Sequence, residues 1–402
     1  CPIRQDIPEY IELCRKEKYT EALALITEKN ALPFTTGTIC AHRCQTKCTR
    51  NYYDDPVQIR ATKLIAAEKG YDDLMASLKK PEPVTDGRKA AIIGGGPTGI
   101  AAAYFLGRAG IPVTVFEQSH KLGGVPRLVI PGFRISEEAI EKDIALMRFY
   151  GAEVKLNTPA PSVSELKAMG YTHIFFAVGA GKAGQLDIPG NVVPVIQWLR
   201  DLKAGKDVSL GHVAGGNTAM DAARAALRAG AKTSTLVYRR TKKYMPADAE
   251  ELELAVEDGV RFLELVAPVE QANGKLKCEV MKLGDPDEKG RRSPVPTGEF
   301  TEINCDTVIA AVGERIDSDL FTANGIEVNA KGIPEFRTNL ENVFVGGDAM
   351  RGPATVVEGI ADAQYFANAV IGSVHSVAIP DDAHATRDEA IARKGILCPP
   401  KA

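Results

Sequence analysis

The stretch KAAIIGGGPTGIAAAYFLGRAGIPVTVFE, residues 89–117, decides the fold of this chain. An apolar run leads into Gly94-x-Gly96-x-x-Gly99, which is followed by an alanine-rich helical pattern and a second apolar run that ends at Glu117. Glycines at these positions permit a tight turn, a close approach of a pyrophosphate to backbone N–H groups, and close packing of the helix. Glu117 stands about where a carboxylate accepts hydrogen bonds from an adenosine ribose. The stretch therefore predicts a strand, turn, helix and strand that bind a dinucleotide.

A second stretch repeats this order. GHVAGGNTAMDAARAALRAGAKTSTLVYRR, residues 211–240, also runs from strand to glycine turn to a helix ending in Arg-Ala-Gly and then to a strand. Two such units indicate two dinucleotide-binding domains in one chain. Where the first unit has Glu117, the second has Arg239 and Arg240, which suit the 2'-phosphate of NADP through charge-assisted bonds. We predict NADPH as the coenzyme of this unit, with NADH less favoured.

The glycine turn of the second unit is irregular. It reads Ala214-x-Gly216-x-x-Ala219, and the strand before it is short and interrupted by Gly211. Either the coenzyme loop is distorted or residues of the native strand are absent from this sequence, and the pattern does not decide between the two. The residues expected to bind the coenzyme are Gly215, Gly216, Asn217, Thr218, Arg239 and Arg240.

A third glycine turn stands near the far end of the chain. In NVFVGGDAMRGPATVVEGIADAQ, residues 342–364, a strand leads into Gly347 and Asp348, and a helix begins near Thr355. This pattern resembles that of flavoproteins with two dinucleotide sites, in which the aspartate holds the ribityl chain of FAD and the helix N-terminus faces the flavin. The alternative is that Asp348 only caps a helix. The flavoprotein interpretation predicts an FAD domain split in sequence, with the second unit inserted.

The first 80 residues differ from the rest, because their apolar positions recur at helical spacing. One of these helices, PVQIRATKLIAAEKG, is expected to end at Gly70. Cys40, Cys44 and Cys48 recur at every fourth residue in TICAHRCQTKC. Eight cysteines among 402 residues are too few for a disulfide framework, so metal or redox chemistry is the favoured use.

Composition excludes several classes of function. A net charge of -3 with both signs mixed gives no basic face for nucleic acid, and no apolar stretch reaches the roughly 18 residues of a membrane span. Without a signal pattern, we expect a cytoplasmic protein. The expected domains are a helical iron-sulfur domain, the first part of the FAD domain, the NAD(P)H domain, the second part of the FAD domain and an irregular tail, over residues 1–80, 81–190, 191–312, 313–378 and 379–402.

Together these motifs resemble one family: the small subunit of glutamate synthase, the N-terminal module of dihydropyrimidine dehydrogenase and, most similar, the selenate-reductase-like iron-sulfur subunits. The resemblance covers nearly residues 1–375 in order. Matching pieces include CPIRQDIPEYI, LPFTTGTICAHRCQTKC, KLGGVPRLVIPGFRI, YRRTKKYMPA, TVIAAVGERID and GGDAMRGPATVVEGIADA. The implied fold is α/β with two Rossmann-like domains, an FAD domain split by an inserted NAD(P)H domain, preceded by an all-α iron-sulfur domain. The resemblance also implies that Gly123, Gly124 and Arg134 line the flavin site, and that this sequence is a fragment of a longer chain.

The resemblance implies a ligand set for a 4Fe-4S cluster. In the family, the residue matching Cys1 joins those matching Cys40 and Cys44 and a glutamine or glutamate, while the residue matching Cys48 serves an upstream cluster. Here Lys63 occupies the glutamine or glutamate position, and a protonated lysine cannot be a ligand. We therefore expect one cluster on Cys1, Cys40, Cys44 and Cys48. The alternative is a split assignment, in which Cys48 belongs to a cluster whose other ligands precede residue 1.

The implied function is electron transfer from NADPH through FAD to a 4Fe-4S cluster and on to a partner domain or subunit that carries the terminal substrate site. No catalytic acid, base or nucleophile is needed, because the cofactors supply the chemistry. Two alternatives remain. A structural or assembly subunit would keep the fold without coenzyme turnover. A disulfide reductase would need a Cys-x-x-Cys pair, which this sequence lacks.

Overall fold

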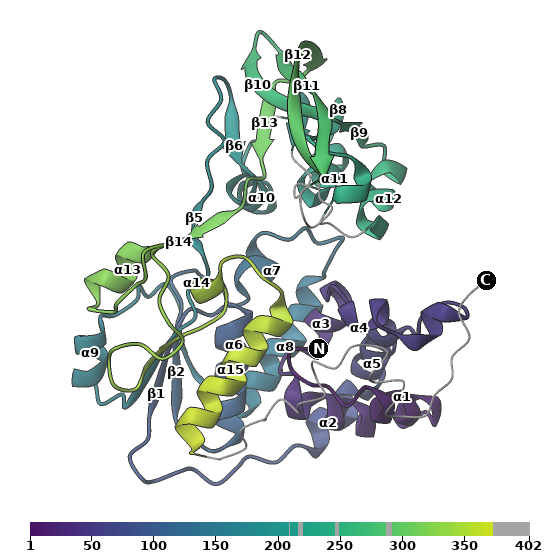
Figure 1. Cartoon of the computed structure of the whole chain (residues 1–402). Helices are drawn as coiled ribbons and strands as arrows, with labels where there is room; N and C mark the ends of the chain where they lie inside the picture. Colours follow the sequence, from purple (N-terminus) through teal and green to yellow (C-terminus); the bar gives the residue numbers. More distant parts are fainter. Residues whose placement is uncertain (209, 216–219, 246–248, 287–291, 373–402) are drawn as a thin grey trace. The chain divides into compact units, whose positions relative to one another are not determined.

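The structure is a computed structural model that describes residues 1–208, 210–215, 220–245, 249–286 and 292–372 (Figure 1). It divides into two compact units. Unit 1 comprises Cys1–Gly124, Ile135–Gly179 and the chain from Ser318 onward, and unit 2 comprises Val125–Arg134 and Ala180–Asp317.

Strand β5 (Gly181–Ala183) pairs antiparallel with β14 (Glu314–Ile316), near the two ends of the longer segment of unit 2. The finer division of the chain into five domains stays a prediction.

The first 80 residues contain only helices, as the sequence predicts. They are α1 (Ile7–Arg15), α2 (Tyr19–Lys29), α3 (Pro33–Ile39), α4 (Arg43–Thr46), the 3-10 helix η1 (Thr49–Tyr52) and α5 (Ile59–Ser77). The expected end of α5 at Gly70 is wrong, since the helix continues to Ser77. A Cβ at Gly70 would stand 2.5 Å from the backbone oxygen of Tyr19, so this glycine serves the close crossing of α5 and α2 and not a helix end.

Unit 1 also holds a parallel sheet in the order β15-β4-β1-β2-β3. Every residue of β1 and β2 is buried, which explains their continuous apolar runs. Phe175 of β4 stacks on Phe366 of α15 with ring centroids 4.5 Å apart, so α15 packs against this sheet. The strands and helices are β1 (Ala90–Ile93), α6 (Pro97–Arg108), β2 (Val113–Phe116), α8 (Glu137–Phe149), β3 (Glu153–Lys155), α9 (Val163–Ala168), β4 (His173–Phe176), α13 (Ser318–Ala323), β15 (Val343–Val345), α14 (Asp348–Arg351) and α15 (Val356–Ile371).

Unit 2 repeats the parallel arrangement in a sheet of order β6-β13-β7-β8-β9 and adds an antiparallel sheet of order β10-β11-β12. Its elements are β6 (Val192–Pro194), α10 (Val195–Lys203), β7 (His212–Gly215), α11 (Met220–Arg228), β8 (Thr233–Tyr238), η3 (Lys242–Tyr244), α12 (Ala249–Glu257), β9 (Arg261–Glu264), β10 (Val266–Ala272), β11 (Lys275–Pro286), β12 (Arg292–Asn304) and β13 (Thr307–Ala310); α7 (Gly124–Leu128) leads into the unit. Within the described ranges, no helix has both the length and the apolar character that crossing a membrane requires. The cytoplasmic location stays a prediction.

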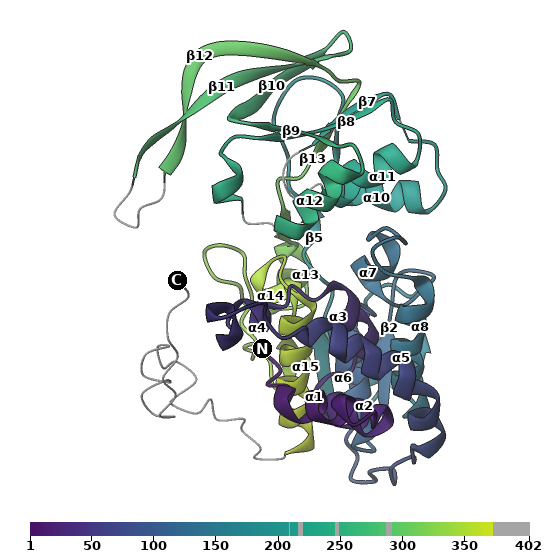
Figure 2. The same ribbon diagram turned by 90° about the vertical axis from the view of Figure 1, so that its right-hand side faces the viewer.

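The N-terminal helices lie beside helices α6 and α8 of unit 1 (Figure 2), and buried polar contacts attach them there. Asp143 of α8 is fully buried and accepts hydrogen bonds from the backbone N–H groups of Phe34 at 3.0 Å and Thr35 at 2.7 Å. These donors belong to the first turn of α3, so the carboxylate also meets the positive end of that helix. Tyr104 of α6 donates to the carbonyl oxygen of Thr27 at 2.9 Å. The N-terminal helices are therefore part of one compact body with the first nucleotide-binding sheet.

Asp143 makes the stability of this junction depend on pH. Burial raises the pKa of Asp143 to about 7, although hydrogen bonds from Thr35 and Phe34 favour the charged form. The unfolded chain has the ordinary value of about 3.9, so the folded state binds more protons between these values. The contribution of Asp143 to stability is then complete below about pH 4 and is lost as pH rises through about 7.

We therefore expect the free energy of unfolding of the native protein, relative to that of Asp143→Asn, to fall by about 1 kcal/mol per pH unit between pH 5 and 7. Urea unfolding of both proteins, followed by circular dichroism at a series of pH values, measures this difference. Asp73→Asn, which changes an exposed aspartate of α5, is the matched control and should leave the pH profile unchanged. Parallel profiles for the native protein and Asp143→Asn would contradict the assignment.

Candidate functional site

The glycine turn after β1 has the geometry that the sequence predicts. Gly94 has φ of +105°, and a Cβ there would stand 2.4 Å from the carbonyl oxygen of Ala177. A Cβ at Gly99 would stand 1.9 Å from the carbonyl oxygen of Gly94. By contrast, a Cβ at Gly96 would meet only the Cα of Gly124, at 3.9 Å. Gly94 and Gly99 are therefore required by the fold itself, while the space beside Gly96 is available to a ligand.

Glu117 directly supports this turn. Its two carboxylate oxygens accept hydrogen bonds from the backbone N–H groups of Gly95 and Ser119, each at 2.7 Å, and the residue is 6% exposed. Each oxygen keeps a second lone pair, so the carboxylate can still accept a ribose hydroxyl. Its role in ribose binding stays a prediction.

Gly123 and Gly124, assigned to the flavin site through the family resemblance, lie against the glycine turn. The N–H of Gly123 donates to the carbonyl oxygen of Gly95 at 2.8 Å. Gly124 has φ of +55°, and a Cβ there would stand 2.8 Å from the Cα of Gly96. The two segments thus meet backbone to backbone, as the resemblance implies.

The third glycine turn reaches the same place from the far end of the chain. A Cβ at Gly347 would stand 2.5 Å from the hydroxyl oxygen of Thr98, in the first turn of α6. The N–H of Gly347 donates to Asp362 of α15 at 2.7 Å. Asp348 accepts a hydrogen bond from the N–H of Ala354 at 3.1 Å, so it shapes the turn, and its ribityl role stays a prediction. The sequence interpretation missed Asp362, although a single acid on the apolar face of a helix could have drawn attention to it.

Helix α15 begins where the sequence predicts. Thr355 is its N-cap residue, and its backbone N–H and hydroxyl both donate to Glu358. Burial alone would raise the pKa of Glu358, but the hydrogen bonds from Thr355 and the nearby guanidinium groups of Arg43 and Arg351 hold it below its ordinary value. Arg43 lies between two of the predicted ligand cysteines, so the cysteine segment comes near the N-terminus of α15.

The second nucleotide unit is better anchored than its sequence suggests. Strand β7 is short, yet it pairs with β13 on one edge and with β8 on the other. The carboxylate of Asp306 accepts a hydrogen bond from the N–H of His212 at 2.7 Å, and a Cβ at Gly211 would stand 2.1 Å from the same oxygen. Gly211 therefore makes room for the carboxylate that fixes the start of β7.

The structure describes only some of the residues of unit 2 that are predicted to bind the coenzyme. Gly215 ends β7, and Arg239 and Arg240 directly follow β8. The predicted residues Gly216, Asn217 and Thr218 lie outside the described residues. Within those residues the buried Nε of Arg240 donates to no acceptor.

Arg134, the third residue taken from the family resemblance, lies in unit 2. It forms ion pairs there with Asp221 at 3.5 Å and Glu251 at 2.5 Å. These contacts account for its partly buried position without a flavin. Its assignment to the flavin site stays a prediction.

The cysteine segment is tied to α5. The side-chain oxygen of Gln45 accepts a hydrogen bond from the N–H of Arg60 at 2.9 Å, and the guanidinium of Arg60 donates to the carbonyl oxygen of Cys40 at 3.3 Å. Burial and the neighbouring Cys40 thiol raise the pKa of Cys44, while Lys63 and the amino terminus at Cys1 act in the opposite direction. Cys40, Cys44 and the amino end of Cys1 therefore lie in one neighbourhood.

Cys14 lies in this neighbourhood as well. Burial raises the pKa of Tyr10, and the thiols of Cys44, Cys14 and Cys40 raise it further. Cys14 of α1 and Cys44 of α4 both pack against the core cluster that includes Tyr10, Ala22 and Ile26. In the described part of the chain, no three side chains of the metal-binding types stand within reach of one ion. The ligand set of Cys1, Cys40, Cys44 and Cys48 stays a prediction.

Lys63 tests whether this neighbourhood suits an anionic cluster. It is 6% exposed, and the described residues give it neither a hydrogen bond nor an ion pair. Burial lowers the pKa of Lys63, whereas Cys40, Cys44 and Asp143 favour its charged form. A buried ammonium without a partner is costly, so a group with negative charge and acceptor atoms fits beside it. The residues present therefore fit an iron-sulfur cluster with thiolate ligands.

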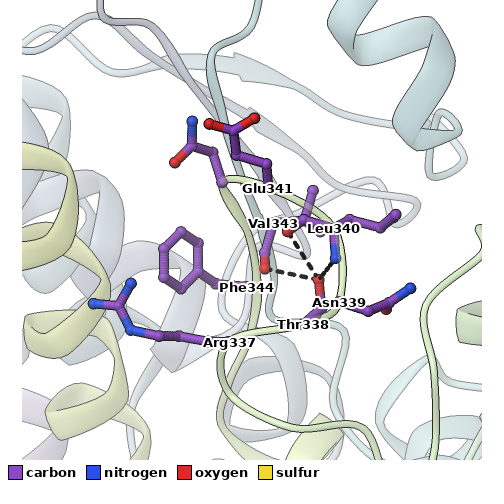
Figure 3. Close-up of a pocket in the computed structure, with 8 residues that line it drawn as sticks. Arg337, Thr338, Asn339, Leu340, Glu341, Val343 and Phe344 are labelled. Carbon is purple, nitrogen blue, oxygen red and sulfur yellow. Dashed lines mark hydrogen bonds between the residues drawn. The ribbon is translucent and has the colours of Figure 1, made fainter.

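A hollow of about 360 Å³ lies elsewhere in unit 1. Figure 3 shows that a single turn forms it, with the hydroxyl of Thr338 bonded to the backbone of Leu340 and Val343. None of the residues predicted to bind a cofactor lines it. The hollow is a feature of this turn and adds no residue to the nucleotide sites.

Comparisons with known proteins agree with this arrangement. Residues 88–363 match the family described as pyridine nucleotide-disulphide oxidoreductase, and residues 1–73 match the family described as dihydropyrimidine dehydrogenase domain II, 4Fe-4S cluster. The predicted cofactor classes, FAD with a nicotinamide coenzyme and a 4Fe-4S cluster, are thereby confirmed for these domains. The predicted family resemblance and the α/β fold class are also confirmed.

Individual relatives and one solved structure agree with the family and the fold class. The Escherichia coli K12 protein named "Putative oxidoreductase YgfK" is 42% identical over 385 residues, covering 92% of this chain and 37% of that protein. The Escherichia coli K12 glutamate synthase [NADPH] small chain is 30% identical over 417 residues, covering 92% of this chain and 87% of that protein. Among solved structures, Mycobacterium tuberculosis FprA in complex with NADPH shares the fold with a TM-score of 0.60 at 19% identity, covering 77% of this chain and 89% of FprA.

Glu117 offers a direct test of the flavin site. In Glu117→Gln, one amide N–H group must face a backbone N–H group of Gly95 or Ser119, which leaves a buried donor unsatisfied at a cost of about 1–3 kcal/mol. We expect the FAD content per purified chain to fall clearly, as measured by flavin absorbance after denaturation. Glu153→Gln, on the exposed neighbouring strand β3, is the matched control and should retain full FAD content. Equal flavin content in the two variants would argue against this site.

Proposed function

The chain belongs to the pyridine nucleotide-disulphide oxidoreductase family and carries a 4Fe-4S domain at its N-terminal end, and from this premise we propose the following function. The protein takes reducing equivalents from NADPH and delivers them through FAD and the 4Fe-4S cluster to a partner domain or subunit. Flavin is needed because NADPH gives up two electrons together, whereas a cluster accepts one. The chain itself binds the cofactors, orients them and fixes their spacing.

One observation carries this proposal. The cysteine segment and the glycine turns of the flavin site belong to the same compact unit, and Arg43 of that segment lies close enough to Glu358 to lower its pKa. Glu358 receives the two hydrogen bonds of Thr355 at the start of α15. A flavin on that helix terminus would therefore lie near the cysteines, as electron transfer between the two requires.

NADPH is favoured over NADH for two reasons. The first is Arg240, which follows β8 after Arg239. Its buried Nε has no acceptor among the described residues. Guanidinium groups suit a 2'-phosphate, which NADH lacks. The second is the name of the glutamate synthase small chain, which specifies NADPH for that relative.

The partner that receives the electrons is proposed to lie outside this chain. The chain spans only 37% of the length of the two most identical relatives reported, and the glutamate synthase relative is named as the small chain of its enzyme. A terminal acceptor on another domain or subunit is consistent with both observations.

Two alternative functions remain to be separated from this one. A disulfide reductase needs two cysteines separated by two residues, and none of the eight cysteines in the sequence has such a partner. A structural subunit would keep the fold without coenzyme turnover. The short strand before Ala214 is the one feature that favours a structural subunit. Its pairing with β13 on one edge and β8 on the other weakens this argument.

Anaerobic stopped-flow spectroscopy tests the proposal. We expect NADPH to bleach the flavin absorbance, and we expect the signal of a reduced 4Fe-4S cluster to develop afterwards in electron paramagnetic resonance (EPR) spectra. Flavin that neither NADPH nor NADH reduces would leave the structural subunit as the better interpretation. Flavin that is reduced without a cluster signal would disprove the cluster step alone.

A prediction for coenzyme choice follows from Arg240. Replacing it by alanine removes a charge-assisted hydrogen bond of about 1.5–3 kcal/mol, so NADPH should bind at least tenfold more weakly while NADH binding changes little. Stopped-flow titration of flavin reduction with each coenzyme gives both constants. Arg261→Ala, on the neighbouring strand β9, removes an exposed arginine and serves as the control. Equal weakening for both coenzymes would contradict a 2'-phosphate contact.

A further inference from the structure

Lys63 is the buried charge that the fold does not neutralise. It lies on α5 one turn after Ile59 and is 6% exposed, and no acceptor among the described residues forms a hydrogen bond or an ion pair with it. Lysine is almost never fully buried without a partner, because removing the ammonium from water is costly. The position therefore calls for a negative group.

The charged and titratable groups around Lys63 limit what this group can be. Cys44 packs against the core cluster that includes Ile59 and Ala66 of the same helix. The thiols of Cys40 and Cys44, the carboxyl of Asp143 and the guanidinium of Arg60 are all near enough to act on Lys63 electrostatically. Asp143 already uses both carboxylate oxygens to accept the N–H groups of Phe34 and Thr35. Arg60 has the same sign as Lys63 and donates to the carbonyl oxygen of Cys40. A negative group that balances Lys63 is therefore expected beside Cys40 and Cys44.

We infer that Lys63 is a positioning residue whose ammonium faces the sulfur atoms of the cluster held by Cys40 and Cys44 and raises the cluster's reduction potential. This inference rests on the proposed function, since it requires a cluster at these cysteines. Lys63 is not a ligand. It acts through charge and N–H···S hydrogen bonds, two of the factors that set the potential of such clusters.

The direction of the effect follows from the charge balance. On reduction, the cluster gains one electron and therefore one negative charge, with no bond formed or broken and no proton transferred. A fixed positive charge at short range stabilises the more negative state more than the less negative one. Low solvent exposure at Lys63 keeps water from screening the interaction. Lys63 thus favours transfer of an electron from reduced FAD to the cluster.

The test compares four variants with the native protein, each purified without oxygen as the complete chain with its cofactors. Lys63→Met and Lys63→Gln remove the charge, and Lys63→Arg retains it. Lys69→Met removes a charge from an exposed position of the same helix and is the matched control. The measurements are iron per chain, FAD per chain, and the midpoint potential of the cluster from a redox titration followed by EPR spectroscopy.

Removing the Lys63 charge should lower the equilibrium constant for electron transfer from reduced flavin to the cluster at least tenfold. For one electron this corresponds to a shift of the cluster's midpoint potential by about 59 mV to more negative values. Lys63→Arg and Lys69→Met should stay within threefold of the native protein. The FAD content should be the same in all of them. Slower reduction of the cluster by NADPH should accompany the shifted potential, with bleaching of the flavin unchanged.

Other outcomes would overturn the inference or the function separately. A native potential in Lys63→Met with full iron content would show that the ammonium does not face the cluster. Loss of iron from both neutral variants would make Lys63 a residue for cluster assembly and would likewise overturn the inference. A native protein that binds no iron would refute the cluster of the proposed function itself.

Discussion

The hydrogen bonds between Asp143 and the first turn of α3 are the contact on which the arrangement of the molecule depends. They bring a carboxylate of the nucleotide-binding half into the N-terminal helices, where it satisfies two backbone N–H groups that no residue of α3 can satisfy. Burying an ionisable group is costly, so a junction of this kind persists only where its geometry is well determined. Helix α3 ends at Ile39 with Cys40 as its C-cap residue, and so the same contact fixes the start of the cysteine segment.

This contact lies entirely within unit 1. The hydrogen bonds of Asp143 and Tyr104 that hold the N-terminal helices to the rest of the unit join residues of unit 1 only. The coenzyme unit is an insertion whose ends are joined by the pair of β5 and β14. The spacing between the cysteines and the glycine turns around Gly96 and Gly347 is therefore set within unit 1.

Local patterns were predictable from the sequence, and long-range contacts were not. Gly94, Gly99 and Thr355 lie as predicted, because each is determined by a turn or a helix end that a few neighbouring residues specify. The helix end at Gly70 was wrong, since the glycine is required by a crossing with α2 and not by its own helix. Asp362 was missed for the same reason: its role arises from contacts with another segment, which the sequence pattern does not show.

The charges around the cysteines also have a physical logic that only the fold reveals. Lys63 stands where the related proteins have a glutamine or glutamate ligand, and a protonated lysine cannot bind iron. The sequence therefore predicted that cysteines alone hold the cluster. In the structure, Lys63 is near enough to Asp143 and to the thiols of Cys40 and Cys44 to interact with them electrostatically, so it can offset negative charge without bonding to iron. Asp143 in turn holds the helix whose C-cap residue is Cys40. One buried acid and one buried base thus link the junction of the domains to the electrostatics of the cluster, because the acid positions the cysteines and the base opposes their charge.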